Sequence, residues 1–162
     1  MIEWKKICCA VDFGDPSRVA MEQAADLARR FEAELTLVHV LVPPPPAASD
    51  VLVSSRGVAS VEAQEHEEKL AEWRGDAERR AGRPVRSRVL WGDPAAEIVR
   101  HAREERCDLL VVGTHGRTGI ARVVLGSVAE RVARESPCPV LVVHDHGALE
   151  KEDVRREIEQ YR

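Results

Sequence analysis

Two patterns of apolar and polar residues alternate along this chain. In the first, short runs of apolar residues, some of them alternating with polar ones, predict strands that are buried in a sheet. Five segments have this pattern: residues 6–11, 35–42, 85–91, 109–112 and 140–143. In the second pattern, apolar residues recur at intervals of three and four, as on the buried face of a helix. Four segments have it, and they begin near Asp15, Val58, Pro94 and Ser127. In the last of them, the predicted inner face consists of Val128, Ala129, Val132 and Ala133.

Strands and helices therefore alternate, which predicts an α/β fold. We expect an open five-stranded parallel sheet, doubly wound by right-handed crossovers that put helices on both faces. Periodicity alone does not give the strand order. Residues 147–162 predict an extra helix that is highly charged and has a thin apolar line. The expected organisation is one domain over residues 1–146 and a charged C-terminal helical extension over residues 147–162.

The second predicted helix follows a run of four prolines, Pro43 to Pro46. Proline cannot donate a ladder hydrogen bond, so this run ends a strand and opens a loop that we expect to reach about Gly57. The helix is predicted over residues 58–81. Its front half, with the sequence EAQEHEEK, is expected to be solvated, and its back half has a buried stripe at Leu70, Trp73, Ala77 and Ala81.

The chemically most informative segment is DLLVVGTHGRTGIARVVLGS, residues 108–127. An apolar strand ends there in a loop with Gly113 and Gly116, and Gly126 with Ser127 precedes a helix. Glycines let the backbone turn tightly and bring N–H groups close to a ligand, and a helix N-terminus attracts anions. The segment therefore predicts a phosphate site. The sequence of this segment lacks both the Gly-Lys-Ser/Thr motif of a P-loop and the Gly-x-Gly start of a dinucleotide fingerprint.

Ser127 and Glu130 also admit a purely structural interpretation. They form Ser-x-x-Glu, a capping box that would start a helix with no ligand present. Gly126 would then serve only a tight turn. This alternative accounts for Ser127 but leaves the pair of glycines at the start of the loop unexplained.

The spacing G-x2-G-x9-G-[S/T] is met by Gly113, Gly116, Gly126 and Ser127, and here the chain resembles the universal stress protein family, in its ATP-binding branch. The likeness covers about residues 5–143. KKICCAVDFGDPSRVAMEQAADLA is similar to the family's first strand and helix, and VVGTHGRTGIARVVLGSVAERVARESPCPVLVV to its C-terminal half. The resemblance implies the strand order 3-2-1-4-5, with a crevice between the ends of strands one and four.

The resemblance also implies roles for single residues. The family's first strand ends in an Asp that contacts the nucleoside part of ATP, and Asp12 is its match. A backbone contact to the adenine falls near Val40. The rest of the implied nucleotide site lies in the glycine loop and the helix start after it: Gly113, Gly116, Gly126, Ser127 and Val128. From the residues alone, Asp12 could instead only cap the turn-rich segment FGDPS.

Composition narrows the class of protein. The 162 residues suit one domain, and 44% hydrophobic and 32% charged residues are typical of a globular protein. The net charge of −4, with both signs mixed along the chain, argues against a nucleic-acid surface. No apolar run approaches the roughly 20 residues of a membrane span, and MIEWKK lacks a signal-peptide core. We therefore expect a cytoplasmic protein with no membrane partner.

The cysteines and histidines offer weaker signals. Adjacent Cys8 and Cys9 should point to opposite faces of a strand, and the four cysteines include no C-x-x-C pair, so we interpret them as small buried residues. His39 is interpreted as a packed strand residue. His144 and His146 flank an Asp, but no third metal ligand is evident, so no metal site is predicted.

These observations favour a regulatory protein that binds ATP, with Mg²⁺ arriving on the triphosphate. Arg117 and Arg122 are candidate charge partners for the phosphates. The apolar segment Val140 to Val143 would lie on a sheet edge in the implied order, so a homodimer through it is expected.

Two other functions stay open. A slow ATPase would use the same site, but the only candidate general base near the loop is His115. A nucleotide-free dimeric module would bind a client protein that the sequence does not identify. A nucleotidyl transferase is disfavoured, because the H-x-G-H signature is missing.

Overall fold

The computed structural model describes residues 3–43, 52–114 and 125–145, and for residues 52–60 it describes the backbone alone. Within these ranges the chain alternates between five strands and four helices. In chain order they are β1 (Lys6–Ala10), α1 (Asp15–Phe31), β2 (Glu34–Leu41), α2 (Leu52–Ala81), β3 (Val85–Trp91), α3 (Pro94–Glu104), β4 (Leu109–Gly113), α4 (Ser127–Glu135) and β5 (Val140–Val143).

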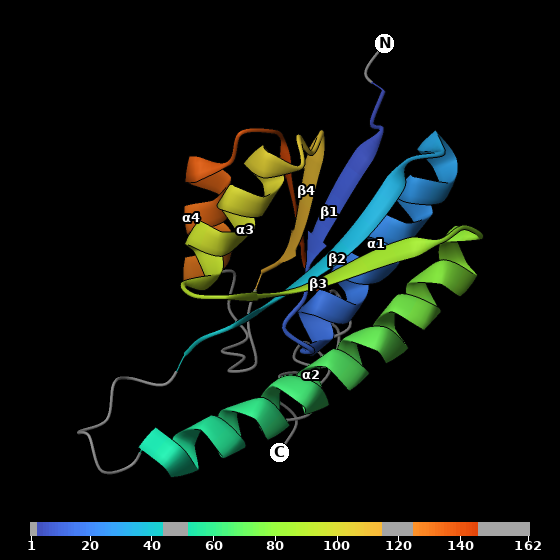
Figure 1. Ribbon diagram of the computed structural model, residues 1–162. Coiled ribbons are helices and arrows are strands. Elements are labelled where there is room, and N and C mark those ends of the chain that lie inside the picture. The colour runs from blue at the N-terminus through green and yellow to red at the C-terminus, as the bar shows by residue number, and fades with distance from the viewer. Residues whose placement is uncertain (1–2, 44–51, 115–124, 146–162) are drawn as a thin grey trace, which may run out of the picture.

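The strands form one parallel sheet in the order β3-β2-β1-β4-β5. Figure 1 shows α1 and α2 on one face of this sheet and α3 and α4 on the other. The chain first adds strands on one side of β1 and then, after β3, crosses to the other side to add β4. The predicted fold class and the order 3-2-1-4-5 are both confirmed, and the switch point lies between β1 and β4.

Each face of the sheet has its own hydrophobic core, because successive side chains of a strand point to opposite faces. Cys9 packs beneath α1 and α2, whereas Cys8 packs beneath α3 and α4, and both side chains are fully buried. The prediction that these neighbours face opposite ways is confirmed. The stripe predicted on the back half of α2 is buried at all four positions: Leu70, Trp73, Ala77 and Ala81.

The start of α2 differs from the prediction. The helix begins at Leu52 instead of Val58, so Gly57 lies inside it. One glycine in a helix costs only about 1 kcal/mol relative to alanine, and the segment between Pro46 and Pro84 contains no proline to interrupt the helix. The other predicted boundaries lie within two residues of those observed.

The inner face of α4 was also predicted only in part. Ala129 and Val132 are buried as expected, but Val128 and Ala133 are exposed. A nine-residue helix on one face of the sheet buries a narrow stripe with a spacing of three, and its neighbours on either side stay in contact with solvent. Val128 is thereby left at the mouth of the pocket described below.

The two edges of the sheet are β3 and β5. On β3, Arg86 and Arg88 are exposed, as is usual for an edge strand with a partly solvated face. Among the helices of the described ranges, none is long and apolar enough to cross a membrane.

Candidate functional site

A pocket of about 490 Å³ opens at the carboxyl ends of β1, β2 and β4. Its volume lies within the range of small-molecule sites. One part of its wall is apolar and comes from β2, β4 and α3: Val38, Val40, Val112 and Ile98. The polar part comes from the loop after β1, the end of β4 and the first turn of α4: Asp12, Ser17, Thr114 and Ser127.

Six of the seven residues predicted for the nucleotide site line this one pocket: Asp12, Val40, Gly113, Gly126, Ser127 and Val128. They meet because the carboxyl ends of parallel strands lie on the same edge of the sheet. The seventh, Gly116, lies outside the described residues. The same holds for His115, Arg117 and Arg122.

The two ends of the glycine loop are held together by the backbone. The Gly126 N–H donates to the Thr114 carbonyl oxygen at 2.6 Å, and the Thr114 N–H donates to the Val143 carbonyl oxygen at 3.0 Å. Gly113 and Gly126, which are 13 positions apart in the sequence, are therefore neighbours in space. The start of α4 is thus fixed against the end of β4.

The first turn of α4 presents backbone N–H groups that the described residues do not use. Gly126 is the N-cap residue, no side chain caps the helix, and Ser127 is already helical. The structural alternative, a Ser-x-x-Glu capping box, is therefore wrong, because Ser127 lies one position too far into the helix for its hydroxyl to act as the cap. The first residues of α4 and its N-cap residue line the pocket: Gly126, Ser127, Val128 and Ala129.

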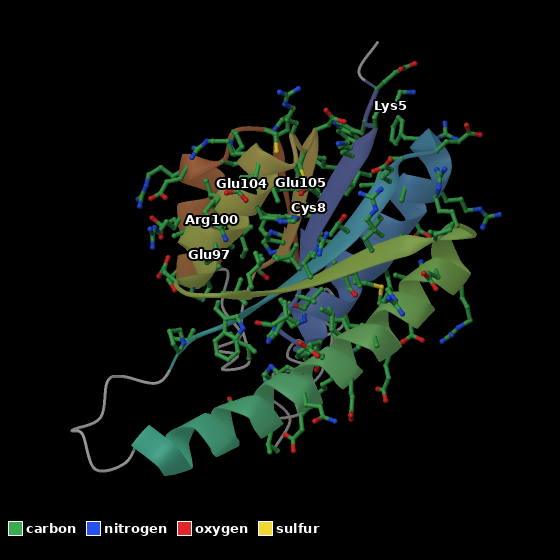
Figure 2. All side chains as sticks on the ribbon, in the orientation of Figure 1. Lys5, Cys8, Glu97, Arg100, Glu104 and Glu105 are labelled. Atoms are coloured by element: carbon green, nitrogen blue, oxygen red, sulfur yellow. The ribbon has the colours of Figure 1, made fainter. Side chains whose placement is uncertain are left out.

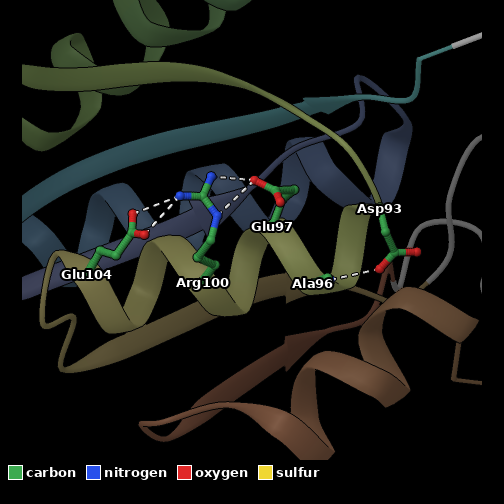
Figure 3. Close-up of polar contacts among 5 residues, drawn as sticks. All are labelled: Asp93, Ala96, Glu97, Arg100 and Glu104. Atoms are coloured by element: carbon green, nitrogen blue, oxygen red, sulfur yellow. Dashed lines mark hydrogen bonds and ion pairs between the residues drawn. The ribbon is translucent and has the colours of Figure 1, made fainter.

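The N-terminus of the neighbouring helix α3, in contrast, is capped by a side chain. Its N-cap residue Asp93 accepts a hydrogen bond from the Ala96 N–H at 2.9 Å (Figure 3). Arg131 of α4 donates to the same carboxylate at 2.6 Å. A carboxylate thus caps the N-terminus of α3, whereas no side chain of the described residues caps that of α4, whose first turn contains the exposed Glu130. Farther along α3, Arg100 links Glu97 and Glu104 on the exposed side of the helix, away from the pocket.

Asp12 organises the turn between β1 and α1. Its Oδ1 atom accepts hydrogen bonds from the Gly14 N–H at 2.9 Å and from the Ser17 hydroxyl at 2.7 Å. Phe13 between them adopts a left-handed conformation with φ of 65°, which is uncommon for a residue with a side chain. Asp12 therefore caps the turn that follows β1, which was the structural alternative for this residue. Asp12 also lines the pocket, and no described residue donates a hydrogen bond to its Oδ2 atom.

Position 113 requires glycine because the backbone of Pro16 approaches it closely. The sequence did not predict this contact. A Cβ atom at this position would lie 2.8 Å from the Pro16 carbonyl carbon and 2.9 Å from its oxygen. The first turn of α1 therefore packs directly against the end of β4. This close approach sets one wall of the pocket and gives Gly113 a structural role, whether or not its N–H contacts a ligand.

Sequence reasoning missed Ser17 and Thr114, both of which are buried and line the pocket. A hydroxyl five residues after the strand-terminal Asp12 was the available signal for Ser17. His39 is buried, as expected for a packed strand residue, and its Nδ1 lies 2.7 Å from the Val11 carbonyl oxygen. Its Nε2 atom lies 2.7 Å from Nδ1 of His66 on α2. No local pattern in the sequence predicts this contact.

Within the described part of the chain, no group of three or more His, Cys, Asp or Glu side chains is arranged to hold a metal ion. His144 and Asp145 belong to that part, whereas His146 lies beyond it.

The topology and the pocket define an open, doubly wound α/β protein with a small-molecule-sized cavity at its switch point. The family model of the universal stress protein family matches residues 3–144, and on this evidence the chain belongs to that family. Universal stress protein MJ0531 from Methanocaldococcus jannaschii is 37% identical over 129 residues, which cover 80% of this chain and 75% of the relative.

Solved structures agree with this assignment. Universal stress protein UspA from Lactobacillus plantarum superposes with a TM-score of 0.80 at 22% identity, over 88% of this chain and 99% of that chain, which is a likeness of fold. A universal stress protein crystallised in complex with cAMP superposes with a TM-score of 0.66 at 29% identity, over 88% of this chain and 98% of its own.

Proposed function

We propose that this chain is an ATP-binding regulatory protein of the stress response that holds the nucleotide in the pocket between β1 and β4. The observation that carries the proposal is the N-terminus of α4, whose first residues line the pocket and which no side chain of the described residues caps, while α3 beside it is capped by Asp93. A phosphate group supplies the negative charge and the acceptors that such a helix end lacks.

The other walls suit the rest of an adenine nucleotide. Apolar side chains of β2, β4 and α3, among them Val40 and Ile98, offer a surface for the base. Asp12 lines the pocket, and its carboxylate is proposed to accept hydrogen bonds from the ribose hydroxyls. The relative crystallised with cAMP supports an adenine nucleotide as the class of ligand. ATP is proposed over other adenine nucleotides because the resemblance to the ATP-binding branch includes the whole G-x2-G-x9-G-S spacing.

Mg²⁺ is proposed to accompany the triphosphate and to keep much of its own water, as this ion does when phosphates supply its ligands. The residues Gly116, Arg117 and Arg122 are proposed to contribute from the loop. The cytoplasmic location and the division into a domain over 1–146 and a charged extension over 147–162 stay predictions.

The nucleotide proposal is tested by mass spectrometry of the denatured protein and by a thermal titration with ATP and Mg²⁺. We expect released adenine nucleotide, or a rise in Tm of about 5–10 °C when ATP exceeds its Kd about 100-fold. Gly126→Val is expected to abolish the rise, because the added side chain would stand beside the N–H groups at the start of α4.

Ala133→Val is the matched control for this variant. It adds the same kind of side chain to the same helix, on an exposed position away from the pocket. It should keep the full response to ATP. Absence of both nucleotide and thermal response in the wild-type protein would refute the proposal and favour the nucleotide-free interaction module.

We also propose that two copies of the chain pair through β5. The carbonyl oxygens of Pro139 and Val143 accept hydrogen bonds from the N–H groups of Leu110 in β4 and of Thr114 just after it. Since backbone groups alternate in direction along a strand, Val140 and Val142 turn their N–H and C=O groups to the open edge. An apolar edge of this kind is usually covered, and a two-fold copy of itself would cover it.

Val142→Pro tests the dimer, because it removes an outward N–H and leaves the bonds to β4 in place. In sedimentation experiments the wild-type protein should have the mass of two chains and the proline variant that of one. Val142→Ala keeps the N–H group and should stay dimeric. A wild-type protein that sediments as a single chain at micromolar concentration would contradict the pairing.

A further inference from the structure

Two histidines from distant parts of the chain meet between β2 and α2. The Nε2 atom of His39 lies 2.7 Å from Nδ1 of His66, and Nδ1 of His39 lies 2.7 Å from the Val11 carbonyl oxygen. His39 is buried and also lines the pocket, whereas His66 is half-buried. These two rings, which we call the histidine pair, connect α2 to the end of β1. Figure 2 labels three side chains of α3 that lie on the other face of the sheet, away from the pair: Glu97, Arg100 and Glu104.

The hydrogen positions of the histidine pair follow from its partners. A carbonyl oxygen only accepts, so Nδ1 of His39 carries a hydrogen and donates it to Val11. In a neutral His39 ring Nε2 is then an acceptor, so Nδ1 of His66 must be the donor across the contact between the rings. Both neutral rings are therefore Nδ1–H tautomers. Their hydrogen bonds run in one direction, from α2 through His39 to β1.

Aromatic packing holds the His39 ring in this orientation. The ring of Phe13, the residue with the left-handed φ of 65°, lies against it with 4.4 Å between the ring centroids. His66 and Trp73 of α2 meet the Phe13 ring edge-to-face, with centroid distances of 5.7 Å and 5.4 Å. The Nζ atom of Lys69 lies 5.3 Å from the centroid of the same ring. Because Phe13 is itself packed against α2, the direction in which His39 donates is set before any ligand binds.

His39 occupies the carbonyl that would continue the pairing of β1 with β2. The register of the two strands ends at Ala10 and Val38, and the Val11 N–H donates to the Val38 carbonyl oxygen at 2.9 Å. In a parallel ladder, the next bond would run from the Val40 N–H to the Val11 carbonyl oxygen. No such bond joins these two described residues, and the oxygen accepts from His39 instead. The pairing therefore stops where Val40 lines the pocket.

We propose that the histidine pair positions the wall of the pocket that binds the base. By holding the Val11 carbonyl oxygen, the pair keeps the Val40 N–H out of the ladder, so that this group can donate to an acceptor nitrogen of the adenine ring. His66 acts through His39 and is a positioning residue. This inference rests on the proposed nucleotide function, and it adds to that function a dependence of base binding on a side chain of α2.

Replacing His66 tests this dependence. In His66→Ala, Nε2 of His39 loses the donor on α2, so the ring can rotate or change its tautomer and release the Val11 carbonyl to the Val40 N–H. We expect the Kd for ATP to rise about tenfold, as for the loss of one hydrogen bond to the ligand. Calorimetric titration with ATP and Mg²⁺ measures the change.

A conservative variant and a control separate the hydrogen bond from simple packing. His66→Asn should bind ATP with a Kd within about twofold of the wild type, because its Nδ2 group is as many bonds from the backbone as Nδ1 of histidine and can donate in its place. Gln64→Ala is the matched control and should leave the Kd unchanged. Gln64 is exposed two positions earlier on the same helix, where its amide donates to Glu68.

Nuclear magnetic resonance of the ligand-free protein tests the histidine pair without a nucleotide. At about pH 8.5, above the range in which histidines usually change charge, long-range proton–nitrogen spectra distinguish the two tautomers of a neutral ring. His39 and His66, assigned by replacing each in turn, should both be Nδ1–H tautomers. An Nε2–H tautomer at either ring would overturn the arrangement of donors and the inference with it.

The binding results distinguish this inference from the nucleotide proposal. If the wild-type protein binds ATP and His66→Ala binds it equally tightly, the positioning role is wrong and the nucleotide site stands. The role is also wrong if His66→Asn binds as weakly as His66→Ala, because the donor would then not be what matters. A wild-type protein that does not bind ATP would refute the nucleotide function itself, and this role together with it. Melting curves verify that each variant is folded.

Discussion

Replacing Gly113 with alanine is expected to lower the free energy of unfolding by about 1–3 kcal/mol, with no nucleotide present. The added Cβ would lie 2.8 Å from the carbonyl carbon of Pro16, 2.9 Å from its oxygen and 3.0 Å from its Cβ. Two of these atoms are backbone, in a helix that is packed on the sheet, so the contact cannot be relieved by a side-chain rotation. Either α1 or the end of β4 must move.

Urea denaturation of wild-type and variant protein measures this effect. Gly75→Ala provides a control of opposite sign, because Gly75 lies in α2 and its added Cβ would meet only the end of the Arg79 side chain at 3.5 Å. Alanine there should stabilise the helix by about 0.5–1 kcal/mol. If Gly113→Ala were as stable as the wild type, the close packing of α1 on β4 would be incorrect.

Asp12→Ala is expected to reduce both stability and nucleotide affinity. It removes the acceptor for the Gly14 N–H and leaves the buried Ser17 hydroxyl without its carboxylate partner. Hydrogen bonds to a charged group contribute about 1.5–3 kcal/mol, so we expect a loss of stability of that order. Without this turn, the pocket also loses the residue proposed to accept hydrogen bonds from the ribose.

Asp12→Asn separates the two effects. Its Oδ1 atom can still accept from Gly14 and Ser17, so the variant should unfold within about 1 kcal/mol of the wild type. Its Nδ2 group, however, would put a donor where the carboxylate offered an acceptor, and ATP affinity should fall about tenfold or more. Calorimetric titration with ATP measures this. An asparagine variant that binds ATP as tightly as the wild type would restrict Asp12 to its role in the turn.

Most of the architecture was predictable from the sequence because it is encoded in local spacing. Runs such as Leu109 to Val112 identify buried strands, and intervals of three and four identify helices. The predictions that failed were those in which several placements satisfy the same local rule. The capping box at Ser127 was wrong by one position, and Val128 lies beside the buried stripe instead of on it. In both cases packing against the sheet decides between neighbouring alternatives.

The sequence by itself therefore determined the α/β class, the positions of the strand ends, and the glycine spacing that placed Gly113 and Gly126 among the candidate residues. Only the packed fold determines which distant groups touch, such as Pro16 against Gly113 and His66 against His39. The physical reason is that periodicity reports only which face of an element is buried. Contacts across elements depend on the packing of whole helices on the sheet, and no spacing along the chain records them.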